Sequence, residues 1–475
     1  MMFSSLVFLF AFLPAVLSAY YLSSLSGPRY RNAVLLVFSY VFYFWSSGPI
    51  LLILAFSTLV DYGLGILIDR SAARKRLGWV SLSIVFNLSL LAYFKYANFF
   101  VGELNHARVM LGSTPLAWTD VVLPAGISFF TFHKITYVVD VYRGVRRATL
   151  NLVDFALYIA LFPQLIAGPI VRYHEISEQI KTRTETLEGF SWGIQRFCWG
   201  LVKKVVFANS CGEIADAVFS SPIEQLDTKT AWLGVFAYTL QIYFDFSGYS
   251  DMAIGLGLLF GFKLPENFNR PYSAHSITDF WRRWHMTLSH FFRDYVYIPL
   301  GGNRRSAVRT SLNLLLVFVL CGLWHGANWT FLVWGAYHGG LLMLERVTGW
   351  GRGEAEDYRV GRRLVTLLLV MIGWVFFRAP NLGRAADLLT LMFVPTNQAV
   401  SFDLAAVLHG RNLAFLLMAA VVLVLPPNFS AARFLMKERA PLAAAIRLGV
   451  LMSVVLYSVA LIASGSYNPF IYFRF

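Results

Sequence analysis

The sequence CGLWHGANWTFLVWGAYHG, residues 321 to 339, combines membrane-like apolarity with ionisable side chains. It is aromatic and apolar enough to lie within a bilayer, yet it carries His325, His338 and Asn328. An ionisable side chain inside hydrocarbon is costly and by default points to function. The stretch therefore predicts membrane-embedded helix that carries functional imidazoles.

The composition of the whole chain indicates a membrane protein. Of the 475 residues, 57% are apolar and only 14% are charged, whereas about one quarter of a soluble chain is charged. The 40 Lys and Arg exceed the 26 Asp and Glu, but they lie in short loops between apolar spans, which is typical of topology signals and not of nucleic-acid binding. We expect an all-α polytopic integral membrane protein with one domain over 1–475 and a motif-rich core at about 120–345.

Apolar stretches long enough to cross a bilayer, roughly 20 residues each, recur along the chain. We count about eleven transmembrane helices, plus re-entrant or interfacial helices. Basic loops at 27–32 and 70–76 flank a hairpin that turns near Gly48, so the positive-inside rule places both loops in the cytoplasm. The predicted spans lie at about 3–25, 33–46, 48–68, 78–101, 150–168, 190–218, 230–262, 311–347, 362–378, 412–427 and 441–465.

The segment 263–310 differs from a lipid-facing helix, because charged, aromatic and turn residues alternate along it. Such a segment must be buried in protein, line a cavity or lie in the membrane interface. Ser276, with Asp279 in the first turn, predicts a helix N-terminus. The predicted helix runs from about 277 to 294 and carries His285 among aromatic residues.

Several blocks of sequence, in matching order, resemble the membrane-bound O-acyltransferase (MBOAT) family. Within that family they are most similar to the bacterial alginate O-acetyltransferase (AlgI-like) branch, which is also similar to the protein that transfers D-alanine to teichoic acid. The likeness extends from the N-terminus to about residue 350. The blocks are VLPAGISFFTF, YVVDVYRG, LFPQLIAGPIVRY, YFDFSGYSDMAIG, LPENFNRPY, DFWRRWHMTLSHFFRDYVYIPLGGNR and LWHGANWTFLVWGAYHG.

The resemblance implies a helical bundle with a central funnel, a cytoplasmic acyl donor and an acceptor outside the membrane. It assigns the catalytic histidine of the family to His325 and the second motif histidine to His285. Attack of a hydroxyl on a thioester needs a base, and a buried imidazole can supply one.

The activity expected from this resemblance is O-acetyl transfer in the bacterial inner membrane. Acetyl-CoA is the expected donor substrate, and no bound cofactor is expected. The expected acceptor is an extracytoplasmic exopolysaccharide such as alginate, reached with the help of extracytoplasmic acetylation proteins, and the surrounding membrane lipids are the other partners. The blocks do not distinguish one polysaccharide from another.

Other residues near the two histidines are candidates for binding the substrate or the donor. Asp279 and Arg282 either contact donor phosphates or hold the histidine helix by salt bridges. Gly301 and Gly302 predict a tight turn, and Arg304 after it is either a topology signal or a phosphate contact. The remaining candidates are Trp281, Trp284 and Asn328.

The sequence also allows interpretations other than catalysis. His285 and His290 have a spacing that places them on different helix faces, so no metal site is expected. Asp245 and Asp251 interrupt an apolar span and suit either a proton or cation pathway or structural pairing with the Lys203-Lys204 region. The alternative function is a membrane transporter or flippase for a polysaccharide precursor, although the inverted repeats typical of transporters are not visible.

Overall fold

The computed structural model describes residues 1–24, 27–350, 360–396, 407–408, 410–424, 441–465, 467–469 and 471. Within these residues the regular secondary structure is helical throughout, which confirms the predicted all-α class. The chain forms two compact units. The first comprises Met1–Gly193 with Ala253–Pro265, and the second comprises Ile194–Met252 with Glu266–Phe475. A single functional domain over 1–475 stays a prediction.

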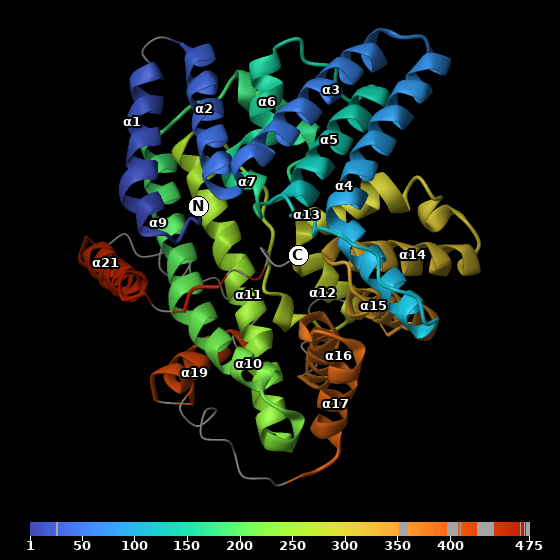
Figure 1. Ribbon diagram of the computed structural model, residues 1–475. Helices are drawn as coiled ribbons and strands as arrows, with labels where there is room; N and C mark the ends of the chain where they lie inside the picture. The colour runs from blue at the N-terminus through green and yellow to red at the C-terminus, as the bar shows by residue number, and fades with distance from the viewer. Residues whose placement is uncertain are drawn as a thin grey trace. The chain divides into compact units, whose positions relative to one another are not determined.

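The first unit is built from paired apolar helices (Figure 1). α1 packs on α2, α2 on α6, and α3 on both α4 and α5. The bounds of these helices are α1 Leu13–Ser24, α2 Pro28–Ser47, α3 Leu51–Arg70, α4 Ala73–Met110, α5 Ile127–Tyr142, α6 Leu152–Ala160, α7 Phe162–Leu165 and α8 Tyr173–Lys181.

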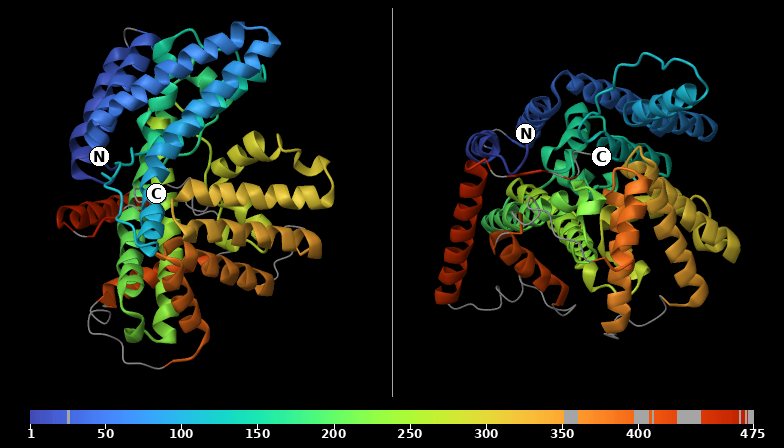
Figure 2. Two further views of the ribbon diagram at one scale, coloured as in Figure 1. Left: turned by 45° about the vertical axis from the view of Figure 1, so that its right-hand side comes forward. Right: turned by 60° about the horizontal axis from the view of Figure 1, so that its bottom comes forward.

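The second unit contains both histidine motifs. Its most extensive helix pair is α14 with α15, and these helices lie side by side in Figures 1 and 2. α15 also packs on α16 and α12. The bounds are α10 Asn209–Ser220, α12 Ile277–Arg283, α13 Met286–Phe292, α14 Ala307–His325, α15 Trp329–Thr348, α16 Val360–Arg378, α17 Leu382–Phe393, α19 Gly410–Val424 and α21 Pro441–Ala463, with most of α9 (Leu187–Val202) and of α11 (Thr228–Leu259).

Helices suited to a membrane are present in both units. Among the described residues, four helical stretches are long and apolar enough to cross a bilayer: Tyr30–Arg70, Ala73–Met110, Ala307–His325 and Val360–Arg378. The last two each have 19 residues and rise about 28 Å, close to the hydrocarbon thickness of a bilayer. The expected membrane character is therefore confirmed, while the number of about eleven crossings stays a prediction.

Two of the predicted spans are wrong in detail. The region 150–168 contains α6, with nine residues and a rise of about 14 Å, and then the single turn α7, so it is too short to cross a bilayer. The region 311–347 is two helices, because residues 326–328 interrupt it between α14 and α15. The sequence analysis also missed α5, whose residues are almost all buried.

The carboxylates in α11 are paired with lysines. Lys204 Nζ lies 2.6 Å from a carboxylate oxygen of Asp245, and Lys203 Nζ lies 2.6 Å from one of Asp251. Buried charges are retained in proteins when they are paired in this way. Of the two interpretations left open by the sequence, the structure therefore supports structural pairing.

Glycines allow α14 and α15 to approach closely. A Cβ at Gly322 would lie 2.2 Å from the carbonyl oxygen of Phe331, and one at Gly335 would lie 2.3 Å from that of Phe318. Both neighbours are backbone atoms, which cannot move without shifting the helix. Small residues serve this purpose in membrane helix pairs generally. The glycines thus position the end of α14, where His325 lies.

Gly335→Ala should separate α14 from α15 and destabilise the protein by about 1–3 kcal/mol, the usual cost of overpacking. The measurement is thermal unfolding in detergent together with the yield of monodisperse protein. Gly340→Ala is the matched control, since it lies in the same helix and its Cβ would meet no atom within 4 Å. Equal stability of the two variants would contradict the close-approach interpretation.

Candidate active site

His325 is the last residue of α14 and is buried in an aromatic cage. Its imidazole centroid lies 4.7 Å from that of Trp324, 5.1 Å from Trp334 and 5.0 Å from Phe377. The helix stops here because the following residue, Gly326, is extended and Asn328 then caps α15. The side chain of Asn328 accepts a hydrogen bond from the backbone N–H of Thr330 at 3.0 Å.

His285 lies at a sharp junction between two short helices. The prediction of one helix over about 277–294 was wrong, because α12 ends at Arg283 and α13 begins at Met286. His285 itself has φ 43° and ψ 54°, the left-handed conformation. The N-cap predicted at Ser276 is confirmed, since its side chain accepts from the N–H of Asp279.

An upstream loop holds this junction in place. The N–H of Met286 donates to the carbonyl oxygen of Asn267, and the N–H of Asn269 donates to that of Arg283, both at 2.9 Å. A left-handed conformation costs a non-glycine residue roughly 1–2 kcal/mol. Such strain concentrates at functional sites, where the surrounding structure holds it. The backbone of His285 therefore supports its assignment to the site independently of the motif.

Asn267 also sets the tautomer of His285. Its Oδ1 lies 3.0 Å from His285 Nδ1, and the same oxygen accepts from the backbone N–H of Thr287 at 3.4 Å. A backbone N–H can only donate, so the atom facing it is the amide oxygen and not the nitrogen. His285 must therefore carry its proton on Nδ1, and Nε2 carries the lone pair.

Burial keeps the imidazole of His285 neutral. The side chain is fully buried and lies outside the four helical stretches long enough to cross a membrane. Removal from water lowers the pKa of His285 to about 3, because a low-dielectric surrounding disfavours the charged form. The imidazole of His285 is therefore neutral at physiological pH.

One indole brings the two histidines together. The ring centroid of Trp324 lies 4.7 Å from that of His325 and 6.1 Å from that of His285. Phe246 of α11 packs edge-on against His285 at 4.7 Å. The two histidines are 40 positions apart in the sequence, but the structure places both imidazoles against the same side chain. Their catalytic roles stay predictions.

The helix α12 is anchored to α15 at its N-terminus and carries an ion pair of its own. The carboxylate of Glu345 on α15 accepts from the N–H groups of Ile277 and Thr278 at the helix N-terminus, where negative charge is favoured. Asp279 pairs with Arg283 at 2.8 Å. Asp279 therefore holds the helix, as one of the two interpretations of this residue predicted, and Glu345 was not identified from the sequence.

The remaining candidates differ in how far they are exposed. Trp281 and Trp284 are buried in aromatic packing, and the indole N–H of Trp281 donates to His338 Nδ1 at 3.3 Å. Arg282 and Arg304 are exposed. The predicted Gly301-Gly302 turn is confirmed by positive φ at both residues. Asn328, in addition to capping α15, donates to the carbonyl oxygen of Pro380.

His338 belongs to the same aromatic cluster as the motif histidines. Trp334 lies between His338 and His325, with centroid distances of 5.2 and 5.1 Å. The family resemblance assigns roles to His325 and His285 and none to His338, although His338 follows His325 by 13 positions in the same block. Within the described residues no group of three His, Cys, Asp or Glu side chains is arranged to hold a metal ion.

A small cavity of about 180 Å³, with some polar groups in its wall, adjoins the His325 cage. Phe377, which contacts His325, is part of its wall. Asp216 and Arg378 form an ion pair on this wall, and Thr330 and Gln241 contribute further polar groups. The cavity can therefore admit a hydroxyl-bearing molecule to within one aromatic ring of the imidazole.

Comparison with known proteins identifies the relatives of this chain. A family model described as the membrane-bound O-acyltransferase family matches residues 120–352. A probable alginate O-acetylase of Pseudomonas putida is 43% identical over 494 residues, with 100% of each chain covered. One of Pseudomonas aeruginosa is 48% identical over 89% of this chain and 81% of the relative. A peptidoglycan O-acetyltransferase of Helicobacter pylori is 37% identical over 82% of this chain and 79% of the relative.

Proposed function

This chain belongs to the membrane-bound O-acyltransferase family, and we propose that it transfers an acetyl group from cytoplasmic acetyl-CoA towards hydroxyls of an extracytoplasmic polysaccharide such as alginate. The relatives named above carry the names of alginate and peptidoglycan O-acetylating enzymes. The proposed location is the bacterial inner membrane, crossed about eleven times around a central funnel.

The observation that carries this proposal is the meeting of His325 and His285 at Trp324. Acyl transfer to a hydroxyl needs a neutral base that is held within reach of the hydroxyl proton. His285 has its tautomer set by Asn267, and His325 is held between three aromatic rings. We assign His325 as the general base and His285 as the residue that orients the thioester or the acceptor.

The proposed step needs only the donor, the acceptor and the imidazole. His325 takes the proton of the acceptor hydroxyl while the oxygen attacks the thioester carbonyl carbon. The C–S bond then breaks, the imidazolium returns its proton to the sulfur, and coenzyme A leaves as the thiol. The acetyl ester remains on the acceptor oxygen.

We propose that the donor approaches from the exposed basic loop that contains Arg304. Arg304 lies in the exposed loop before α14, whereas His325 lies at the other end of that helix. Exposed arginines suit the phosphates of coenzyme A. Asp279, Trp281 and Trp284 hold the junction between α12 and α13, where His285 lies. Asn328 positions the turn after His325.

Sealed vesicles with a known protein orientation test the direction of transfer. We expect acetyl-CoA to be consumed only when it is supplied on the face that carries the basic loop 301–309. Protease cleavage of a terminal tag would establish the orientation, and detergent-opened vesicles would give the total activity. Equal turnover from both faces of sealed vesicles would refute the sidedness.

A partner protein is proposed to carry the acetyl group onward to the polymer. The cavity beside His325, at about 180 Å³, is far too small to hold a long polysaccharide. Purified protein with acetyl-CoA and bare alginate should therefore acetylate the polymer poorly. Efficient polymer acetylation without any second protein would contradict the need for a partner, while leaving acyl transfer itself intact.

A further inference from the structure

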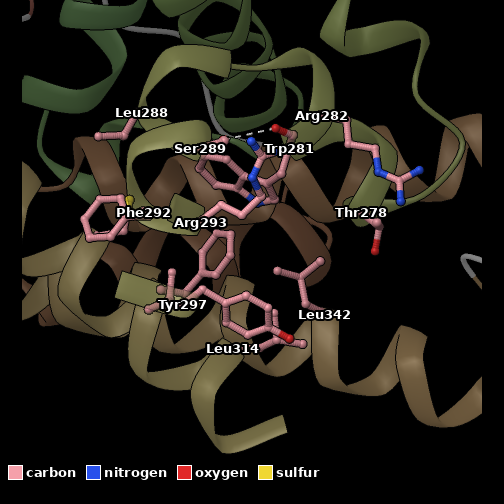
Figure 3. Close-up of a pocket in the computed structure, with 13 residues that line it drawn as sticks. Thr278, Trp281, Arg282, Leu288, Ser289, Phe292, Arg293, Tyr297, Leu314 and Leu342 are labelled. Carbon is pink, nitrogen blue, oxygen red and sulfur yellow. Dashed lines mark hydrogen bonds between the residues drawn. The ribbon is translucent and has the colours of Figure 1, made fainter. Parts of the chain in front are cut away.

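A second cavity is lined by the helices next to His285 and His325 (Figure 3). This groove has a volume of about 240 Å³ and is formed between α12–α13 and α14–α15. Its wall is almost entirely apolar and includes Leu288, Phe292, Leu314, Val317, Phe318 and Leu342.

Positive charge borders this apolar groove. Arg282 and Arg293 are among the lining side chains drawn in Figure 3, and both are exposed. Arg293 is paired with Asp294 at 2.7 Å. Arg282 has no ion-pair partner among the described residues. An apolar groove with an uncompensated guanidinium at its edge is complementary to a molecule that has an apolar chain and an anionic head.

One of the helices that line the groove also has a face that suits the bilayer. α14 is one of the helices long and apolar enough to cross a membrane. Leu312, Leu316 and Leu320 repeat along one face of it and are exposed, while Leu314, Val317 and Phe318 face the groove.

We propose that this groove binds an acyl chain of an anionic phospholipid, whose phosphate lies against Arg282. The arm of coenzyme A fits it less well, because that arm carries amides that need hydrogen-bond partners and the wall offers almost none. This lipid site takes no part in acetyl transfer. In this proposal Arg282 binds a lipid phosphate, and Arg304 binds the phosphates of the donor.

A bound lipid would also stiffen the junction between α12 and α13, where His285 lies. Trp281 and Leu288, which line the groove, lie on α12 and α13 on either side of His285. The Trp281 indole in turn contacts His338. The site thus gives the membrane a direct contact with the elements that hold His285.

Photocrosslinking in nanodiscs tests this site without measuring activity. The probe is phosphatidylglycerol with a photoreactive acyl chain, and crosslinked residues are mapped by mass spectrometry. We expect labelling of α14 near Val317 and Cys321. Arg282→Gln should lower it about fivefold, the effect of one basic residue on an anionic lipid. Val317→Trp should also lower it, by filling the groove.

Matched controls are present on the same helix. Arg309→Gln removes an exposed arginine that does not line the groove, and Leu316→Trp adds the same bulk on the exposed face; both should label as the wild type does. Equal labelling of Arg282→Gln and Arg309→Gln would overturn the proposal. So would equal labelling by a phosphatidylcholine probe, or displacement of the lipid by acetyl-CoA, which would identify the groove as a donor site.

Discussion

His325→Ala is expected to reduce acetyl transfer by a factor on the order of a hundred to ten thousand, the range associated with a positioned general base. The variant should still fold, because the imidazole is replaced by a methyl group among aromatic rings and no charge is left unpaired. The cavity should cost about 2–5 kcal/mol. The measurement is acetyl-CoA turnover in membranes, normalised to monodisperse protein.

His325→Phe separates the chemistry from the packing. Phenylalanine restores an aromatic ring between Trp324, Trp334 and Phe377 but supplies no base. We therefore expect it to recover the thermal stability lost in His325→Ala and none of the turnover. A well-folded Ala or Phe variant with near-normal turnover would end the catalytic assignment, and His325 would then be a packing residue.

His285→Ala is expected to lower turnover on the order of a hundredfold and to change the apparent KM for acetyl-CoA, because His285 is assigned to orient the reacting groups. It should also lose stability, since alanine must adopt the left-handed conformation of residue 285 without a polar side chain. Separate measurement of kcat and KM distinguishes the orienting role from that of His325, whose loss should affect kcat alone.

His285→Asn is the matched variant for the backbone. Asparagine tolerates the left-handed region better than alanine does, and its amide can still donate to Asn267 Oδ1. We expect it to melt at a higher temperature than His285→Ala and to be equally inactive. If His285→Asn retained most of the wild-type turnover, the imidazole would be dispensable and the junction would be only structural.

Much of the membrane character was predictable from the sequence because it depends on local composition. The spans at 33–46 and 48–68, the turn near Gly48 and the capping residue Ser276 were all identified correctly. The region 150–168 was not, since its apolarity reflects burial among protein helices and not contact with lipid. Average hydropathy does not distinguish these two environments.

The motifs located the candidate histidines, but contacts distant in sequence decide their geometry. Periodicity alone favoured an unbroken helix through His285. In the structure, hydrogen bonds with Asn267 and Asn269 interrupt the helix at this residue. The block LPENFNRPY contains both asparagines, yet nothing in its composition tells with which backbone groups they form hydrogen bonds. The charge at the start of α12 likewise comes from Glu345, which lies 68 positions after Ile277.

The chain alone specifies apolar helices, their caps and the residue types of the site, because these follow from interactions between near neighbours. Only the folded second unit brings His285 and His325 to the same indole, that of Trp324, and sets the tautomer of His285. The physical reason is that a strained backbone and a buried, oriented imidazole are stable only when many long-range hydrogen bonds and packed rings hold them at once.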